Sequence, residues 1–169
     1  MKLSAKVEQA LNDQLNLELR SAYAYLGMAA YFDHTAFSGC ASWMSLQSRE
    51  ELKHADKFFN YLAERGGKIA LQALPAPRCD YKSVLEVFQT SLIQEEEVSA
   101  SVNRLYELAA ADKDFSTLAF LKWFLDEQVE EEKSVGDMVA RLKLVGDNPT
   151  SLLQLDQFAA RRAAGETGG

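Results

Sequence analysis

The 169 residues of this chain are 47% hydrophobic and 25% charged, which fits one globular domain with a full hydrophobic core. The formal net charge of −7, without any run of lysine or arginine, argues against a nucleic-acid-binding surface. No stretch approaches the roughly 18 uninterrupted apolar residues that a membrane span requires, so we expect no membrane partner either.

The N-terminal residues, Met-Lys-Leu-Ser-Ala-Lys-Val-Glu, contain no apolar segment of the kind found in secretory signals. The two cysteines, Cys40 and Cys79, are too few to form a disulfide framework in a domain of this size. We therefore expect a reducing compartment, the cytoplasm. A cleaved transit peptide is the alternative that the sequence leaves open.

Hydrophobic residues at spacings of three and four predict a first helix over residues 4–32, with Ser4 as its N-cap, and a second over residues 37–65, stopped by glycines. Residues 66–81 contain two glycines and two prolines and show no helical period. Sixteen residues is long for a bundle connection, but at about 3.3 Å each they can span the roughly 42 Å of a 28-residue helix. We interpret this segment as a crossover, after which the third helix runs parallel to the second.

The same spacing predicts a third helix over residues 82–111 and a fourth over 115–145. Asn148-Pro149 ends that element, and we expect Thr150 to cap a short fifth helix over residues 150–162. Residues 163–169 are small or polar and are predicted to be a disordered tail. The chain is thus predicted to be a single all-α domain, residues 1–169, built as a four-helix bundle with a long crossover and a short C-terminal helix.

Each long helix carries a glutamate on its apolar face near mid-length: Glu18, Glu51, Glu95 and Glu131. Glu51 is followed three residues later by His54, so the two side chains are neighbours on one helix face. The glutamates lie about 13 to 16 residues from the starts of their helices, which is about 20 to 24 Å along the axis. In a bundle of up, down, down and up helices the middles coincide, so all five side chains are expected to meet at one level.

Several adjacent buried carboxylates cannot all stay ionised unaided, because like charges raise one another's pKa. The nearby lysines and arginines lie off the apolar stripes. A pair of divalent cations would resolve the conflict, and oxygen ligands with one imidazole suit iron, manganese or zinc. Singly, a Glu-x-x-His pair or a glutamate on a stripe often has a plain structural explanation, but four at one level with a histidine favour a metal centre.

These residues resemble the metal ligands of ferritins, specifically the non-haem bacterial type with a diiron ferroxidase centre. The resemblance runs over about residues 5–162, including the crossover and the fifth helix. It implies that Glu18, Glu51 and His54 hold the first iron. It further implies that Glu51 bridges to a second iron, which Glu95 and Glu131 also hold.

The resemblance also implies a third, more transient iron site formed by Glu50, Glu127, Glu130 and Glu131, with Gln128 facing the centre. A bacterioferritin would instead carry a second Glu-x-x-His motif on the fourth helix. Its haem-binding methionine would stand where this chain has Leu52. We therefore predict that the protein binds no haem. Residues 117–121 are apolar, so the acidic three-fold entry channel of animal ferritins is not predicted here.

By resemblance, Fe(II) is oxidised by dioxygen at the paired site, and ferric oxyhydroxide mineral is stored inside a hollow homo-oligomeric shell of twenty-four subunits. The fifth helix would line the four-fold axes of that shell. Tyr25, seven residues after Glu18 on the same face, is a candidate one-electron donor in the oxidation. The alternative is a core tyrosine whose hydroxyl is simply satisfied.

Three alternatives stay open. A diiron oxygenase or peroxidase of the rubrerythrin type usually carries two histidines at its site, whereas this chain has one. A structural ferritin subunit that does not oxidise iron would lack several ligands that are present here. A four-helix interaction protein would bind no iron at all. The sequence does not determine the iron entry route, the iron-release partner, or whether other subunits share the shell.

Overall fold

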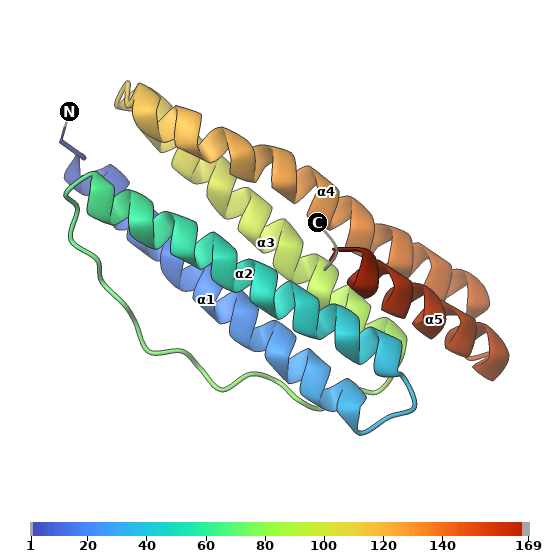
Figure 1. Cartoon of the computed structure of the whole chain (residues 1–169). Coiled ribbons are helices and arrows are strands. Elements are labelled where there is room, and N and C mark those ends of the chain that lie inside the picture. Colours follow the sequence, from blue (N-terminus) through green and yellow to red (C-terminus); the bar gives the residue numbers. More distant parts are fainter. Residues whose placement is uncertain (1, 167–169) are drawn as a thin grey trace.

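The computed structural model describes residues 2–166, which form five helices and no strand. In chain order the helices are α1 (Ala5–Asp33), α2 (Ser38–Glu64), α3 (Val84–Ala111), α4 (Phe115–Val145) and α5 (Pro149–Glu166). The four long helices form a bundle, and the crossover before α3 runs along its outside, from the end of α2 back to the end where α2 began (Figure 1). Helix α3 therefore runs parallel to α2, and the predicted four-helix bundle is confirmed. In this described part of the chain, no helix is both long and apolar enough to cross a bilayer.

The starts of three long helices follow directly from the sequence. The first amides of a helix have no carbonyl partner within it, so a side-chain oxygen just before the helix stabilises them. Ser4, Ser83 and Asp114 each accept a hydrogen bond from the main-chain amide three residues later, at 3.2, 3.1 and 3.2 Å. The predicted N-cap at Ser4 is thereby confirmed.

Helix α5 differs from the sequence prediction at both ends. It begins at Pro149 rather than Thr150, because the Asn148 side-chain oxygen accepts a hydrogen bond from the Ser151 amide at 2.9 Å and acts as the N-cap. Proline suits the first helical position, since it has no amide hydrogen to leave unpaired.

The helix also continues through residues 163–166, which were predicted to be disordered. Ala163 is buried, so this last turn is packed against the rest of the protein. Residues 167–169 lie outside the described residues.

Helix α5 docks on the start of α2, where Phe37 provides no side-chain cap. The Asp156 carboxylate of α5 instead accepts a hydrogen bond from the Cys40 amide at 2.7 Å. A Cβ atom on Gly39 would lie 1.9 Å from the main-chain oxygen of Asp156, so only glycine allows the two helices to approach this closely. The end of the chain thus completes a helix that begins more than a hundred residues earlier.

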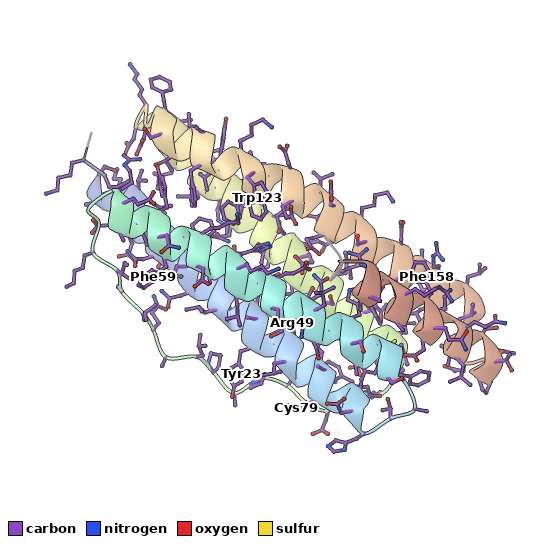
Figure 2. All side chains as sticks on the ribbon, in the orientation of Figure 1. Tyr23, Arg49, Phe59, Cys79, Trp123 and Phe158 are labelled. Atoms are coloured by element: carbon purple, nitrogen blue, oxygen red, sulfur yellow. The ribbon has the colours of Figure 1, made fainter. Side chains whose placement is uncertain are left out.

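The hydrophobic core consists of two clusters at opposite ends of the bundle. One contains Phe32, Trp43 and Phe88 among its buried members, and the other contains Leu11 and Phe58. Each long helix also places buried polar residues between the two clusters. Side chains extend into the space between the helices along the bundle (Figure 2). The polar layer is therefore enclosed by apolar packing above and below.

Two buried asparagines on α1, one turn apart, hold the crossover. Asn12 donates to the Lys68 carbonyl at 2.9 Å and accepts from the Ala70 amide at 2.7 Å. Asn16 donates to the Ala70 carbonyl at 2.8 Å and accepts from the Gln72 amide at 2.8 Å. Each carboxamide therefore replaces one rung of a β-ladder along an extended segment that has no strand partner. This pairing sets the path of the crossover along α1.

We expect Asn16→Ala to release the middle of the crossover while leaving the bundle folded. The substitution removes both hydrogen bonds to the segment, and the free energy of unfolding should fall by about 1–3 kcal/mol. Hydrogen–deuterium exchange should show lost protection at the Gln72 amide, with protection at Ala70 retained through Asn12. The exposed Gln9→Ala variant is the control. Unchanged protection at Gln72 would contradict the assignment.

Candidate metal centre

The polar layer at mid-bundle contains one acidic side chain from each long helix and one imidazole. Glu18 comes from α1, Glu51 and His54 from α2, Glu95 from α3 and Glu131 from α4. All five are buried: Glu18 and Glu95 are 0% exposed, and the most exposed, Glu131, is 5% exposed. The predicted residues therefore share one enclosed layer.

Three of these residues form a compact group. Glu18, Glu51 and His54 each offer a ligand atom, and these atoms all lie within 4.8 Å of one another. His54 Nδ1 lies 3.5 Å from Glu51 Oε2. Both of these atoms, and Glu18 Oε2, are buried without a hydrogen-bond partner among the described residues. Buried polar atoms are normally paired, because leaving them unpaired is unfavourable by several kcal/mol. Three unpaired oxygen and nitrogen atoms close together provide the ligands that a cation site requires.

Buried glutamine amides hold three of the carboxylates in place. The pairs are Gln14 with Glu18 (2.8 Å), Gln47 with Glu131 (2.8 Å) and Gln128 with Glu95 (3.3 Å). A neutral amide donor orients a carboxylate without cancelling its charge, so the demand for a cation persists. Gln14 and Gln47 were not predicted as site residues. The available signal was their position, one helical turn before Glu18 and Glu51 on the same apolar stripes.

Tyr25 contacts the centre through Glu95. Its buried hydroxyl donates a hydrogen bond to Glu95 Oε1 and lies 2.8 Å from the Ser91 hydroxyl. Burial, followed by the charge of Glu95, raises the pKa of Tyr25, so the phenol keeps its proton. The hydroxyl is thus satisfied, as in an ordinary core tyrosine. The same contact places the phenol one hydrogen bond from a candidate ligand.

His54 is held by aromatic side chains of α4. Its ring makes edge contacts with Trp123 and Phe124, at centroid distances of 5.3 and 5.9 Å. Trp123 is partly exposed, and the Lys57 ammonium lies 4.1 Å from the centroid of its ring. These contacts fix the orientation of the imidazole toward the carboxylates.

Burial raises the pKa of every carboxyl in the layer, and repulsion between the carboxylates raises the pKa of three of them further. Burial is the largest cause for each, and the next is a neighbouring carboxylate for three of them: Glu51 for Glu18, and Glu95 for both Glu51 and Glu131. The pKa of Glu95 is also raised by burial, although hydrogen bonds from Tyr25 and Gln128 oppose the rise. The pKa of Glu131 reaches about 8. Without a cation the layer therefore retains protons at neutral pH, and a bound cation would displace them.

The residues predicted for a third site lie at the margin of this layer. Glu50 and Glu127 are half-buried, and Glu130 is exposed. Glu50 is close enough for its charge to raise the pKa of both Glu51 and Glu131. Gln128 is buried and contacts Glu95, so it faces the centre. The third site itself stays a prediction.

Comparison with known proteins decides the family. The ferritin family model, described as a ferritin-like domain, matches residues 8–145. The chain is 41% identical to the bacterial non-heme ferritin of Staphylococcus aureus (strain USA300), over 97% of this chain and 99% of that protein. The chain belongs to the ferritin family. Its relationship to ferritins supports a role in iron storage.

Solved ferritin structures share the fold closely. The open pore ferritin from the hyperthermophilic archaeon Archaeoglobus fulgidus superposes with a TM-score of 0.91 at 42% identity, covering 94% of this chain and 96% of that one. A humanized archaeal ferritin gives a TM-score of 0.92 at 43% identity, with the same coverage. The arrangement of helices and crossover is thus that of a ferritin subunit.

We expect Glu131→Gln to stabilise this ferritin chain when it is free of metal, and more so at high pH. The folded pKa of Glu131 is raised from 4.5 to about 8. Between these values the folded state keeps a proton that the unfolded chain has released, so stability falls as pH rises across this window. The isosteric amide removes that penalty. At pH 8 the gain should be at least about 1 kcal/mol, or about 2–4 °C in Tm.

Calorimetry of chelator-treated protein at pH 5 and pH 8 measures this difference. The exposed Glu107→Gln variant serves as the control, and its profile should follow the wild type. Parallel pH profiles for the wild type and Glu131→Gln would show that Glu131 does not hold its proton in the folded state.

Proposed function

We propose that this chain oxidises Fe(II) with dioxygen at the buried centre and stores ferric oxyhydroxide mineral inside a hollow shell of twenty-four copies. The observation that carries the proposal is the group of unpaired ligand atoms on Glu18, Glu51 and His54. A dry site rich in carboxylates and holding one imidazole suits iron. Iron is here the substrate and the cargo, and it leaves the centre after oxidation.

The proposed roles are those that the resemblance to ferritins implies. Glu18, Glu51 and His54 hold the first iron, Glu51 bridges to the second, and Glu95 and Glu131 complete the second site. Hard oxygen ligands favour Fe(III) over Fe(II), so they promote loss of one electron from each iron to dioxygen. The protons that the carboxyls release on metal binding leave them as anionic ligands.

Iron oxidised at this centre has to leave it again, and we assign that step to a series of carboxylates of increasing exposure. Glu131 is buried, Glu50 and Glu127 are half-buried, and Glu130 is exposed. Together they would form the third, transient iron site, with Gln128 at its inner edge. Increasing contact with water weakens the hold of each carboxylate on the cation, which favours transfer toward the mineral.

Assembly into a shell is supported by an exposed apolar surface over α1, α2 and the crossover. Its members are Tyr23, Leu26, Leu52, Phe59, Leu71 and Leu74. Figure 2 shows Tyr23 and Phe59 on this side of the molecule. Large exposed apolar surfaces favour association between subunits, and a closed symmetric assembly creates the cavity that one bundle lacks. Leu52 lies in this surface and offers no thioether to a haem, so we propose a shell without haem.

The free cysteines support a cytoplasmic location. Cys40 is buried and Cys79 is exposed, and neither forms a disulfide. An exposed free thiol fits a reducing compartment.

Glu51→Ala should abolish fast iron oxidation, because it removes the ligand assigned to both irons. Oxidation is followed by near-ultraviolet absorbance after mixing Fe(II) with protein in air, and the variant should match the protein-free rate. The control is Glu96→Ala, an exposed carboxylate on α3, which should retain the wild-type rate. Wild-type kinetics in Glu51→Ala would refute the assignment. A wild-type particle that sediments near the 18.8 kDa of one chain would refute the shell.

Tyr25→Phe should leave Fe(II) binding intact and change the course of oxidation. The phenyl ring fills the same buried space but removes the hydrogen bond to Glu95 and the readily oxidised hydroxyl. Anaerobic Fe(II) titration measures binding, and rapid-freeze paramagnetic resonance measures any tyrosyl radical formed on exposure to air. Tyr31→Phe, in the same helix, is the control. Identical transients in wild type and Tyr25→Phe would leave Tyr25 with a purely structural role.

A further inference from the structure

Ser21 belongs to the row of α1 side chains that faces the centre. Gln14, Glu18, Ser21 and Tyr25 follow one another at helical spacings of four, three and four, and each is at most 1% exposed. Ser21 therefore lies between a candidate ligand and the tyrosine that contacts Glu95. Its hydroxyl is buried and has no hydrogen-bond partner among the described residues. A buried hydroxyl of this kind is normally satisfied by water.

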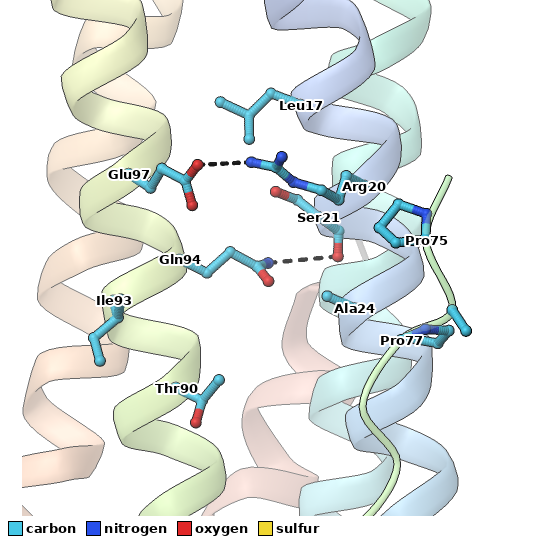
Figure 3. A pocket seen from close by; sticks show the side chains of 11 residues that line it. Leu17, Arg20, Ser21, Ala24, Pro75, Pro77, Thr90, Ile93, Gln94 and Glu97 are labelled. Carbon is cyan, nitrogen blue, oxygen red and sulfur yellow. Dashed lines mark hydrogen bonds and ion pairs between the residues drawn. The ribbon is translucent and has the colours of Figure 1, made fainter. Parts of the chain in front are cut away.

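The same serine also lines a cavity of about 300 Å³ that opens between α1, the crossover and α3, and that we call the vestibule. Its walls include Leu17, Ser21 and Ala24 of α1, and Ile93 and Gln94 of α3 (Figure 3). A water molecule occupies about 30 Å³ in the liquid, so the vestibule has room for several molecules of that size. Ser21 thus borders both the metal centre and a space that reaches the surface.

Two side-chain contacts span the vestibule beside Ser21, the Arg20–Glu97 ion pair and a hydrogen bond from Gln94. Gln94 extends from α3 toward α1, and its amide donates a hydrogen bond to the Ser21 main-chain oxygen at 3.4 Å (Figure 3). Gln94 directly precedes Glu95. This distance is longer than the usual N–H···O range of about 2.7–3.2 Å, so the hydrogen bond is weak and does little to hold the side chain in place. The contact therefore joins α3 to α1 across the vestibule only loosely.

The vestibule is electrically neutral. Its two charged residues, Arg20 and Glu97, form an ion pair at 2.6 Å with each other. The other walls are mainly apolar and include Pro75 and Pro77 of the crossover. A cation would leave water for apolar walls without gaining a free carboxylate, which is unfavourable. A small uncharged molecule meets no such barrier.

We propose that the vestibule admits dioxygen to the metal centre between α1 and α3, with the Gln94–Ser21 contact as its gate. This inference rests on the proposed function, in which dioxygen is the neutral substrate. The Ser21 hydroxyl provides the inner end of the passage, beside Glu18 and Tyr25. It holds a water molecule there until dioxygen displaces it.

Filling the vestibule tests this role without touching a ligand. Ala24→Phe places an aromatic ring in the cavity from a half-buried wall position, and Ala24→Ser is the matched control that keeps it open. Iron oxidation is measured by stopped flow over a range of dioxygen concentrations, and anaerobic Co²⁺ binding is measured in parallel. Ala24→Phe should raise the apparent KM for dioxygen severalfold, leaving kcat at saturating dioxygen and Co²⁺ binding unchanged.

A second variant guards against misfolding. Ile93→Trp enlarges an exposed side chain at the rim, at a site that is 65% exposed, and should raise the same KM. With an active wild type, unchanged dioxygen dependence in both variants overturns the vestibule alone. Slower Co²⁺ binding in either variant assigns the passage to metal and overturns the proposal as well. A wild type no faster than the protein-free control overturns the proposed function together with the vestibule.

Discussion

Mutual repulsion among carboxylates in a dry interior is the constraint on which this structure depends. Glu18, Glu51, Glu95 and Glu131 each come from a different helix. Burial is the largest cause of the raised pKa of every one, and neighbouring carboxylates raise the pKa of three of them further. Protons neutralise part of this charge when no cation is bound, and multivalent cations would neutralise it more effectively. The glutamine partners and the apolar clusters on either side keep the carboxylates from moving apart. The fold without metal is therefore less stable than it could be, because its carboxylates are held together in the arrangement that a cation would need.

The topology makes this layer possible. Because the crossover returns the chain along the bundle, α2 and α3 run parallel, and the middles of all four helices coincide. Asn12 and Asn16 hold the crossover on α1 through paired main-chain hydrogen bonds. Asp156 joins α5 to the start of α2 in a comparable way. These three polar side chains, which show no special pattern in the sequence, therefore fix how distant segments lie against one another.

The two sides of the proposed centre differ in charge, and this difference would separate the departing iron from the entering dioxygen. Glu50, Glu127 and Glu130 provide an acidic margin of increasing exposure, which suits a cation. The vestibule between α1 and α3 is neutral and largely apolar, which suits dioxygen. Oxidised iron would then leave the buried layer along one path, and dioxygen would enter it along another. Neither path would require opening the bundle.

The sequence by itself determined the helices, the crossover and the layer of five ligand candidates, because these follow from local periodicity and from helix length. Hydrophobic spacing sets which face of each helix is buried, so Glu51 and His54 were identifiable from a three-residue interval. Only the tertiary structure showed that Gln14 and Gln47 orient the carboxylates, and that Asp156 caps α2. It also showed that α5 starts with Asn148 as its cap and continues through Ala163, and that Ser21 borders a cavity. The contacts of Gln47 and Asp156 join segments far apart in the chain, which local patterns do not reveal. The contacts of Gln14 and Asn148 are local, four and three residues along the chain, but spacing alone does not show which of several nearby polar groups a side chain meets.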